Sequence, residues 1–184
     1  VGIVAGKIRL HARKGYNNII FGDPKHTEVI GLMGYTEDRG HCIRDAEDIA
    51  NLPELGDKVV MVSQTTMFTD DFHNLANIAR QRFPELLVFD TICGATKDRQ
   101  GDIAVLHEAG VEAFVVIGGH HSANTCKLAL LARKTGLPTF HVETVKELNA
   151  EDFQSFNCVG VTAGASTPDF LIDAVCQHLA KLPA

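Results

Sequence analysis

The chain has 184 residues, of which 45% are hydrophobic and 22% are charged, as in ordinary globular proteins with one or two packed cores. A net charge of -6 without a basic patch argues against general nucleic-acid binding, and no apolar run is long enough to span a membrane. Five cysteines without paired spacing, and no visible signal peptide, indicate a reducing, cytoplasmic setting.

The first half of the chain alternates between helical and strand patterns. Helical periodicity covers residues 2–14 with Ile3 and Ile8 on its apolar side, and Gly15 is expected to end this helix. The strands are continuously apolar, which predicts a parallel sheet covered on both faces. The other elements expected here are a strand over 18–22, a helix up to about Tyr35, a weak strand at 42–43, a short helix over 45–52, a strand over 58–63 and a helix over 69–82.

The stretch 86–96 lies at the midpoint of the chain. Its apolar run over 86–89 predicts a buried strand, which leads into a polar turn carrying Cys93 and then into a helix from about Thr96. Cys93 is therefore expected at the carboxyl end of a strand. That edge is where open α/β sheets place their ligands.

The second half of the chain repeats this order. We expect a helix over 96–109 ended by Gly110, strands over 113–118, 139–142 and 158–162, a helix that follows the loop 119–124 and runs to Thr135, a short helix over 145–148, and a last helix with Pro168 at its first position. Landmarks recur at a nearly constant offset, in the pairs Gly15 and Gly110, Gly22 and Gly118, Ile49 and Leu148, and Ser63 and Thr162. The chain is therefore predicted to be a tandem repeat of one β/α unit, with units 1–85 and 86–184.

The repeat also predicts what precedes this sequence. Cys93 lies a fixed interval before Gly110, and the same interval before Gly15 falls just upstream of Val1. We therefore expect a strand and a second cysteine immediately upstream, in a longer protein.

Polar loops at the carboxyl ends of the strands form a candidate anion site. His26, the loop Ser122-Ala123-Asn124 and the turn Gly164-Ala165-Ser166 each precede a helix, where backbone N–H groups and the helix dipole favour an anion. Taken singly, each side chain is more readily interpreted as a simple helix cap. The repeat places them on the same side, which favours a phosphate or diphosphate site.

A carboxylate beside hydroxyl groups is a second candidate. Glu28 and the pair Thr65-Thr66 follow neighbouring strands, an arrangement suited to a proton relay. Stabilisation of a helix dipole and ordinary capping explain the same residues. His120 and His121 are either anion ligands or exposed bystanders, and Asp90 is interpreted as orienting its turn.

Cys93 has three interpretations, as a nucleophile, a metal ligand or an inert buried thiol. Its position and its expected upstream counterpart favour a metal, because thiolates on equivalent sheet edges facing one centre are typical of part of an iron–sulfur ligand set. The other four cysteines are expected in the core; they are Cys42, Cys126, Cys158 and Cys176.

Together, the motifs resemble one known family. They occur in order, namely Phe21-Gly22-Asp23-Pro24-Lys25, His26-Thr27-Glu28-Val29, Gln64-Thr65-Thr66, Thr91-Ile92-Cys93 with Ala95-Thr96 and Arg99-Gln100, Ser122-Ala123-Asn124, and 159–166 (VGVTAGAS). The combination is similar to the LytB/IspH family, the hydroxymethylbutenyl diphosphate reductases that end the non-mevalonate isoprenoid pathway. The resemblance spans essentially the whole chain.

The resemblance implies an α/β fold with three similar units around a central [4Fe-4S] cluster, each unit contributing one cysteine. This chain would be the second and third units. Cys93 would be a ligand of the cluster, and the other two cysteine ligands would lie upstream of Val1. The isolated chain would then be inactive.

The implied reaction converts 4-hydroxy-3-methylbut-2-enyl diphosphate to isopentenyl and dimethylallyl diphosphate, with electrons from a ferredoxin or flavodoxin. Glu28, helped by Thr65 and Thr66, would supply the proton that lets hydroxide leave as water. The residues that would bind the substrate are His26, Gln64, Ser122, Asn124 and Ser166.

Two positions depart from the family pattern. Thr27 stands where many members carry proline, and Ala123 replaces a common serine, which removes one hydroxyl donor to the diphosphate. From the residues alone, an alternative function is a non-redox diphosphate-binding α/β module.

Overall fold

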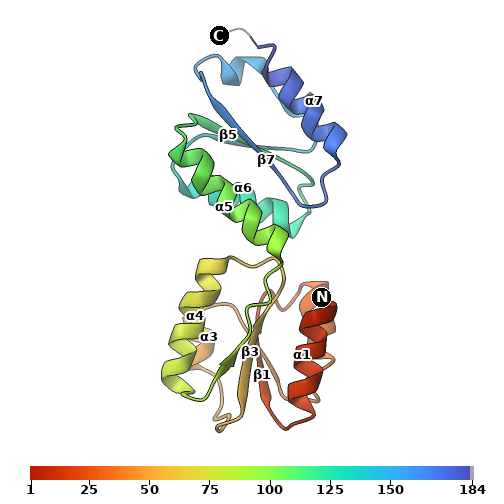
Figure 1. The fold of residues 1–184 in the computed structure, drawn as a ribbon, viewed down its shortest axis with the longest axis vertical. Helices are drawn as coiled ribbons and strands as arrows, with labels where there is room; N and C mark the ends of the chain where they lie inside the picture. The colour runs from red at the N-terminus through yellow and green to blue at the C-terminus, as the bar shows by residue number, and fades with distance from the viewer. Residues whose placement is uncertain (183–184) are drawn as a thin grey trace. The chain divides into compact units, whose positions relative to one another are not determined.

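The computed structural model describes residues 1–182 and divides into two compact units, Val1–Cys93 and a second from Gly94 onward (Figure 1). Each unit holds a parallel sheet with helices on both faces. The predicted α/β class is therefore confirmed. The five cysteines, all within residues 1–182, are free thiols.

The first unit builds a four-stranded parallel sheet in the order β2-β1-β3-β4. Helices and strands alternate along the chain as predicted. The first helix ends at Ala12, two residues before the predicted end, and Gly15 lies in the turn that follows, with a φ of +79° that favours glycine. The elements are α1 (Gly2–Ala12), β1 (Asn17–Phe21), α2 (Thr27–Met33), β2 (Gly40–Ile43), α3 (Ala46–Ala50), β3 (Val59–Ser63), α4 (Thr69–Arg82) and β4 (Leu87–Val88).

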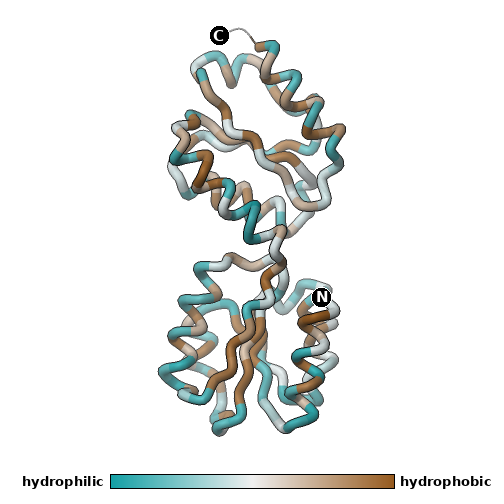
Figure 2. Tube along the Cα trace, viewed as in Figure 1, coloured by the Kyte–Doolittle hydropathy of each residue, from teal (hydrophilic) through white to brown (hydrophobic). Residues whose placement is uncertain are grey.

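The core of the first unit is split between the two faces of the sheet. Successive side chains of a strand point to opposite faces, so Ile19 and Phe21 of β1 pack with α3 and α4, whereas Ile20 packs with α1 and α2. Phe21 stacks on Phe72 of α4, with 6.3 Å between the ring centroids. Figure 2 shows the hydrophobic residues concentrated along these strands.

The second unit builds a three-stranded parallel sheet in the order β6-β5-β7. This order matches β2-β1-β3 strand for strand, as the tandem repeat predicts. The elements are α5 (Gly94–Glu108), β5 (Ala113–Ile117), α6 (Ala123–Lys134), β6 (Thr139–Val142), the 3₁₀ helices η1 (Val145–Glu147) and η2 (Ala150–Phe153), β7 (Val159–Ala163) and α7 (Asp169–Leu179).

The same two-sided core recurs in the second unit. Phe114 and Val116 of β5 pack against α5 and α6, while Val115 and Ile117 pack against α7 and the 3₁₀ helices. All four of these side chains are fully buried. A strand with both faces covered explains why its sequence is an unbroken apolar run.

The stretch 86–89 differs from the prediction of a buried strand. The strand β4 has two residues, Leu87 is 38% exposed and Val88 is half-buried, because β4 lies at the sheet edge and pairs only with β3. That pairing also moves the boundary between the compact units. The first unit runs to Cys93, instead of ending at the predicted residue 85.

Three further expectations are wrong in detail. Pro168 is the N-cap of α7 instead of its first residue, and Ile3, expected on the apolar side of α1, is 77% exposed. The four cysteines expected in the core are not in it: Cys42 is half-buried, and Cys126, Cys158 and Cys176 are exposed. The apolar periodicity of a helix identifies its buried face only where that face packs against a sheet.

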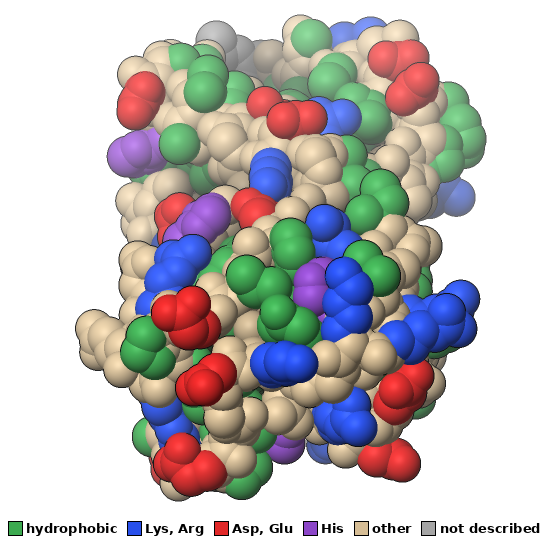
Figure 3. All heavy atoms as spheres, turned by 60° about the horizontal axis from the view of Figure 1, so that its bottom comes forward, with side chains coloured by type: hydrophobic (Ala, Val, Ile, Leu, Met, Phe, Trp, Pro, Cys, Tyr) green, Lys and Arg blue, Asp and Glu red, His purple; other side chains and the backbone are tan. Residues whose placement is uncertain are grey.

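The surface carries charges of both signs. Figure 3 shows Lys and Arg side chains interspersed with Asp and Glu side chains over the face that it presents. Within residues 1–182, none of the helices combines the length and the apolar character that crossing a membrane requires.

Arg82 gives a test of this packing. Its guanidinium donates to the carbonyls of Ile49 (2.7 Å), Ala50 (2.8 Å) and Leu52, which leave the C-terminal end of α3. We expect Arg82→Ala to lower the free energy of unfolding by about 1–3 kcal/mol, because these carbonyls lose a charged donor. Urea denaturation measures the change.

The matched control is Arg80→Ala, since Arg80 is exposed on the same helix and bonds the Asn77 side chain at 3.2 Å. This variant should stay within about 0.5 kcal/mol of the wild type. Equal losses in the two variants would contradict the structural role given to Arg82.

Candidate functional site

All strands of one sheet are parallel, so their carboxyl ends meet at one edge. In the first unit this edge carries most of the residues that the sequence singled out, and we call it rim 1. Its members follow β1, β3 and β4, and they are His26, Glu28, Gln64, Thr65, Thr66 and Cys93.

The centre of rim 1 is a two-point contact between Glu28 and Thr65. The Thr65 backbone N–H donates to Glu28 Oε1 at 3.0 Å, and the Thr65 hydroxyl donates to Glu28 Oε2 at 2.9 Å. Both carboxylate oxygens are therefore held, and the Glu28 side chain has a fixed orientation. The predicted pairing of this carboxylate with a neighbouring hydroxyl is present in the structure.

Gln64 and His26 order the loops on either side of this pair. Gln64 Oε1 accepts the Asp23 N–H at 3.0 Å, and its Nε2 donates to the Thr66 hydroxyl at 3.2 Å. His26 is the N-cap of α2, and its Nδ1 accepts the Glu28 N–H at 3.2 Å. An accepting Nδ1 leaves Nε2 as the protonated nitrogen of the neutral ring, which is a donor available to a ligand.

Cys93 reaches rim 1 through the backbone. Its N–H donates to the Thr65 carbonyl at 2.9 Å. The backbone of Cys93 is therefore bonded to the same residue that holds Glu28. A reciprocal pair of bonds fixes the approach: Thr91 Oγ1 donates to Ser63 O at 2.7 Å and accepts Ser63 N–H at 2.8 Å. The side chain of Asp90 accepts the Ile92 N–H at 3.1 Å, the turn-orienting role predicted for it. Cys93 is exposed, which excludes an inert buried thiol.

The corresponding edge of the second unit, which we call rim 2, consists of the loop 118–124 and the turn 163–167. Ser122 is the N-cap of α6, and its hydroxyl accepts the Thr125 N–H at 3.3 Å. Capping is therefore one role of Ser122. The Nδ2 of Asn124 is enclosed and has no hydrogen-bond partner in the structure, so this amide retains donor capacity beyond what the fold uses.

Ser166 is exposed in the turn that leads to α7. This turn is packed tightly against the β5–α6 loop. A Cβ added to Gly118, whose φ is +140°, would lie 2.7 Å from Thr167 Oγ1 and 2.9 Å from Thr125 Oγ1, and a Cβ on Gly164 would also collide with Thr125. The Thr167 hydroxyl donates to Ile117 O at 3.0 Å. The two segments of rim 2 are thus held in contact through glycines.

Cys93 differs chemically from Cys42. Burial raises the pKa of the Cys42 thiol to about 11, and the charges of Asp48 and Asp23 add to this effect while Arg44 opposes it. Cys42 also donates to the Gly22 carbonyl at 3.4 Å. Across residues 1–182, no three His, Cys, Asp or Glu side chains are grouped so that they could hold a metal ion. Cys93 could therefore contribute one ligand to a metal centre, but the described residues do not group further ligands around it.

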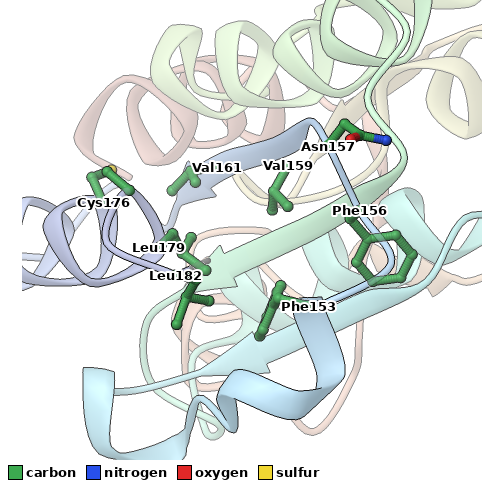
Figure 4. Close-up of a pocket in the computed structure, with 9 residues that line it drawn as sticks. Phe153, Phe156, Asn157, Val159, Val161, Cys176, Leu179 and Leu182 are labelled. Carbon is green, nitrogen blue, oxygen red and sulfur yellow. The ribbon is translucent and has the colours of Figure 1, made fainter. Parts of the chain in front are cut away.

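A cavity of about 430 Å³ lies away from rim 2, at the amino-terminal end of β7. Figure 4 shows its lining, in which Phe153, Phe156 and Val159 face the apolar side of α7 at Leu179. The motifs that the sequence analysis singled out are not among its lining residues.

Sequence reasoning missed the residues that support the rims. Thr91 holds the end of β3, Thr125 and Thr167 fill the space beside Gly118, and Glu147 contacts the His120 ring at 3.0 Å. Thr125 and Thr167 could have been anticipated from Gly118, because a glycine at the end of a strand indicates that another group approaches the backbone closely. No local signal marks Glu147, because its partner is distant in sequence.

Comparison with known proteins decides the family. Residues 1–180 match the family described as LytB protein, and this match covers nearly the whole chain. The chain belongs to the LytB family. The predicted resemblance is thereby confirmed.

Individual LytB relatives carry a common name. Three proteins named 4-hydroxy-3-methylbut-2-enyl diphosphate reductase are similar to this chain. The protein from Opitutus terrae is 62% identical over 99% of this chain and 63% of its own length. That from Geobacter sulfurreducens is 41% identical over 90% and 58%, and that from Alkaliphilus oremlandii is 38% identical over 94% and 61%. The chain therefore spans less than two thirds of these relatives.

Two solved structures share the LytB fold. The E-1-hydroxy-2-methyl-but-2-enyl-4-diphosphate reductase from Plasmodium falciparum superposes with a TM-score of 0.91 at 25% identity, covering 99% of this chain and 58% of its own. A structure described as (E)-4-hydroxy-3-methyl-but-2-enyl diphosphate reductase, the terminal enzyme of the non-mevalonate pathway, gives a TM-score of 0.58 at 32% identity, covering 98% and 64%.

The thiols give a direct test of the rim. At about pH 8 only about one Cys42 thiol in a thousand is ionised, given its pKa of about 11, and the thiolate is the reactive form. We expect iodoacetamide to modify exposed Cys93 at least about tenfold faster than half-buried Cys42. Peptide mass spectrometry measures both rates in one sample. Equal rates would contradict the environments described for the two thiols.

Proposed function

We propose that this chain forms part of a 4-hydroxy-3-methylbut-2-enyl diphosphate reductase, an oxidoreductase that yields isopentenyl and dimethylallyl diphosphate. The observation that carries the proposal is the linked set of contacts at rim 1. Thr65 holds the Glu28 carboxylate with two hydrogen bonds, and the carbonyl of the same residue accepts the Cys93 N–H. The names of the relatives support the same reaction.

The reaction takes up two electrons and two protons, breaks the allylic C–O bond and releases water. We assign the proton for the leaving hydroxyl to Glu28. The two hydrogen bonds from Thr65 fix the orientation of the Glu28 carboxyl group, as a general acid requires, and Gln64 Nε2 holds the neighbouring Thr66 hydroxyl at 3.2 Å. Hydroxide is a poor leaving group, so its protonation lowers the barrier to C–O cleavage.

Rim 2 supplies neutral donors for the diphosphate. Ser122 and Asn124 lie at the start of α6, where the helix dipole favours an anion, and Asn124 Nδ2 is a donor that the fold leaves without a partner. Ser166 adds an exposed hydroxyl from the neighbouring turn. On rim 1, His26 offers its Nε2 and Gln64 orders the adjacent loop, so both are assigned to substrate binding.

Cys93 fits one position in the ligand set of a [4Fe-4S] cluster, because it is an exposed thiol fixed by its backbone at the sheet edge. A bound cluster would supply the electrons and a site for the substrate hydroxyl. The remaining cysteine ligands are expected from the preceding unit that the repeat predicts.

A small ferredoxin or flavodoxin is the proposed source of electrons. The five free cysteines support a reducing compartment, which we take to be the cytoplasm. An exposed cluster ligand such as Cys93 also favours a reducing, low-oxygen setting.

Glu28→Gln tests the proton assignment. In a longer form that carries the additional upstream unit, we expect kcat to fall by about 100-fold or more with a small change in KM, because the amide keeps the hydrogen-bonding shape but has no acidic proton. Steady-state kinetics with the allylic diphosphate measures both constants. Glu47→Gln, an exposed carboxylate change on α3, should leave both unaltered.

Cys93→Ala tests the cofactor assignment. We expect anaerobic iron and sulfide analysis of the longer form to find a cluster that Cys93→Ala severely depletes, whereas Cys158→Ala retains it, since Cys158 lies at the opposite end of a strand. Unchanged iron content in Cys93→Ala would overturn the ligand assignment. An absence of iron from the wild type as well would favour the non-redox diphosphate-binding module.

A further inference from the structure

The β5–α6 loop is held by two carboxylates. The His120 N–H donates to Glu143 Oε1 at 2.7 Å, and the His120 ring contacts Glu147 Oε2 through Nε2 at 3.0 Å. Glu147 Oε1 accepts the N–H groups of Glu143 (3.1 Å) and Thr144 (3.2 Å). Every oxygen of Glu147 is thus engaged, and η1 is tied to the loop that precedes Ser122.

These acids lie beside a proposed anion site, which poses an electrostatic problem. Two carboxylates close to a loop that binds a diphosphate repel it. Burial works against ionisation of Glu147, but the hydrogen bonds from His120 and from the backbone of Glu143 and Thr144 outweigh it, so its pKa is lowered. Glu147 therefore stays charged at neutral pH, and a nearby cation would offset its repulsion of an anion.

His120 is placed to be that cation. Its ring lies 4.5 Å, between centroids, from the ring of His141 on β6. His141 Nε2 contacts the Gly118 carbonyl at 2.9 Å, so His141 is occupied with the backbone. Cys126 on α6 also contacts this residue, because its Sγ donates to the His120 carbonyl at 3.0 Å. Glu147 is thus the acid that faces the His120 ring.

We propose that His120 is a proton-linked binding residue of rim 2: when protonated, it neutralises Glu147 and makes the Ser122–Asn124 loop receptive to a diphosphate. The inference rests on the diphosphate role proposed for rim 2. It assigns a function to the His120–Glu147 pair, which none of the proposed catalytic steps uses. Its consequence is that affinity for the anion depends on the protonation of His120.

The test uses inorganic pyrophosphate as the probe, titrated calorimetrically into the 184-residue chain without divalent metals. We expect His120→Gln to weaken binding about fivefold at about pH 6, because the Glu147 charge is then unopposed. At about pH 8, above the ordinary titration range of a histidine side chain, the wild type and His120→Gln should bind equally. Comparing variants at each pH removes the titration of pyrophosphate itself.

A second substitution separates charge from structure. In the double variant His120→Gln/Glu147→Gln, the uncompensated acid is gone, so affinity at about pH 6 should return to within about twofold of the wild type. Glu147→Gln alone should not weaken binding, since it leaves His120 unopposed. Matched controls are His107→Gln on α5 and Glu151→Gln on η2, both exposed, which should leave affinity unchanged at either pH.

Each outcome decides the proposal. Equal weakening by His120→Gln at both pH values, without recovery in the double variant, would mean that the pair only holds the loop and would overturn it. Unaltered binding in His120→Gln would overturn it as well and leave the diphosphate role of rim 2 standing. If the wild-type chain binds no pyrophosphate at either pH, the diphosphate role of rim 2 fails, and this inference fails with it.

Discussion

The constraint on which this molecule depends is parallel strand pairing within each sheet. A parallel pair aligns the carboxyl ends of its strands, so the loops after β1, β3 and β4 must meet, as must the loops after β5 and β7. Glu28 and Thr65 are far apart in sequence, yet this geometry brings them within hydrogen-bonding distance. The helices that cover both faces leave the rims as the place where polar groups from several strands gather.

The two rims are built by different local means. Rim 1 uses charged and amide side chains that satisfy one another, with Glu28 and Gln64 as the main acceptors. Rim 2 uses glycine packing, with Gly118 and Gly164 pressed against threonine hydroxyls, and it retains donors such as Asn124 Nδ2. Under the proposed function this difference is sensible, because a proton donor needs a fixed orientation whereas an anion needs donors that remain available.

Much of the fold, and the sheet edge that carries the motifs, could be predicted from the sequence for physical reasons. Unbroken apolar runs identified β1, β3 and β5, and the spacing of glycines revealed the repeat, so the topology and the edge on which the motifs lie followed. Errors arose where tertiary context decides. The run over 86–89 looks like a buried strand, but it pairs at a sheet edge, and three of the cysteines expected in the core are exposed. The His120–Glu147 contact depends on loop geometry that no local pattern encodes. The resemblance to a family supplied the roles of the rim residues, which spacing alone left open.

The tight packing behind rim 2 has a consequence for how this protein can change over time. Gly118 and Gly164 have no room for a methyl group, so they resist substitution whatever ligand is bound. The exposed positions Ala165 and Ser166 and the half-buried Ala123 lie next to them without that restriction. Substitutions in this rim are therefore tolerated mainly at these few positions, while the backbone beneath them keeps its conformation. A lineage can alter the donors offered to a ligand there while the backbone that presents them stays the same.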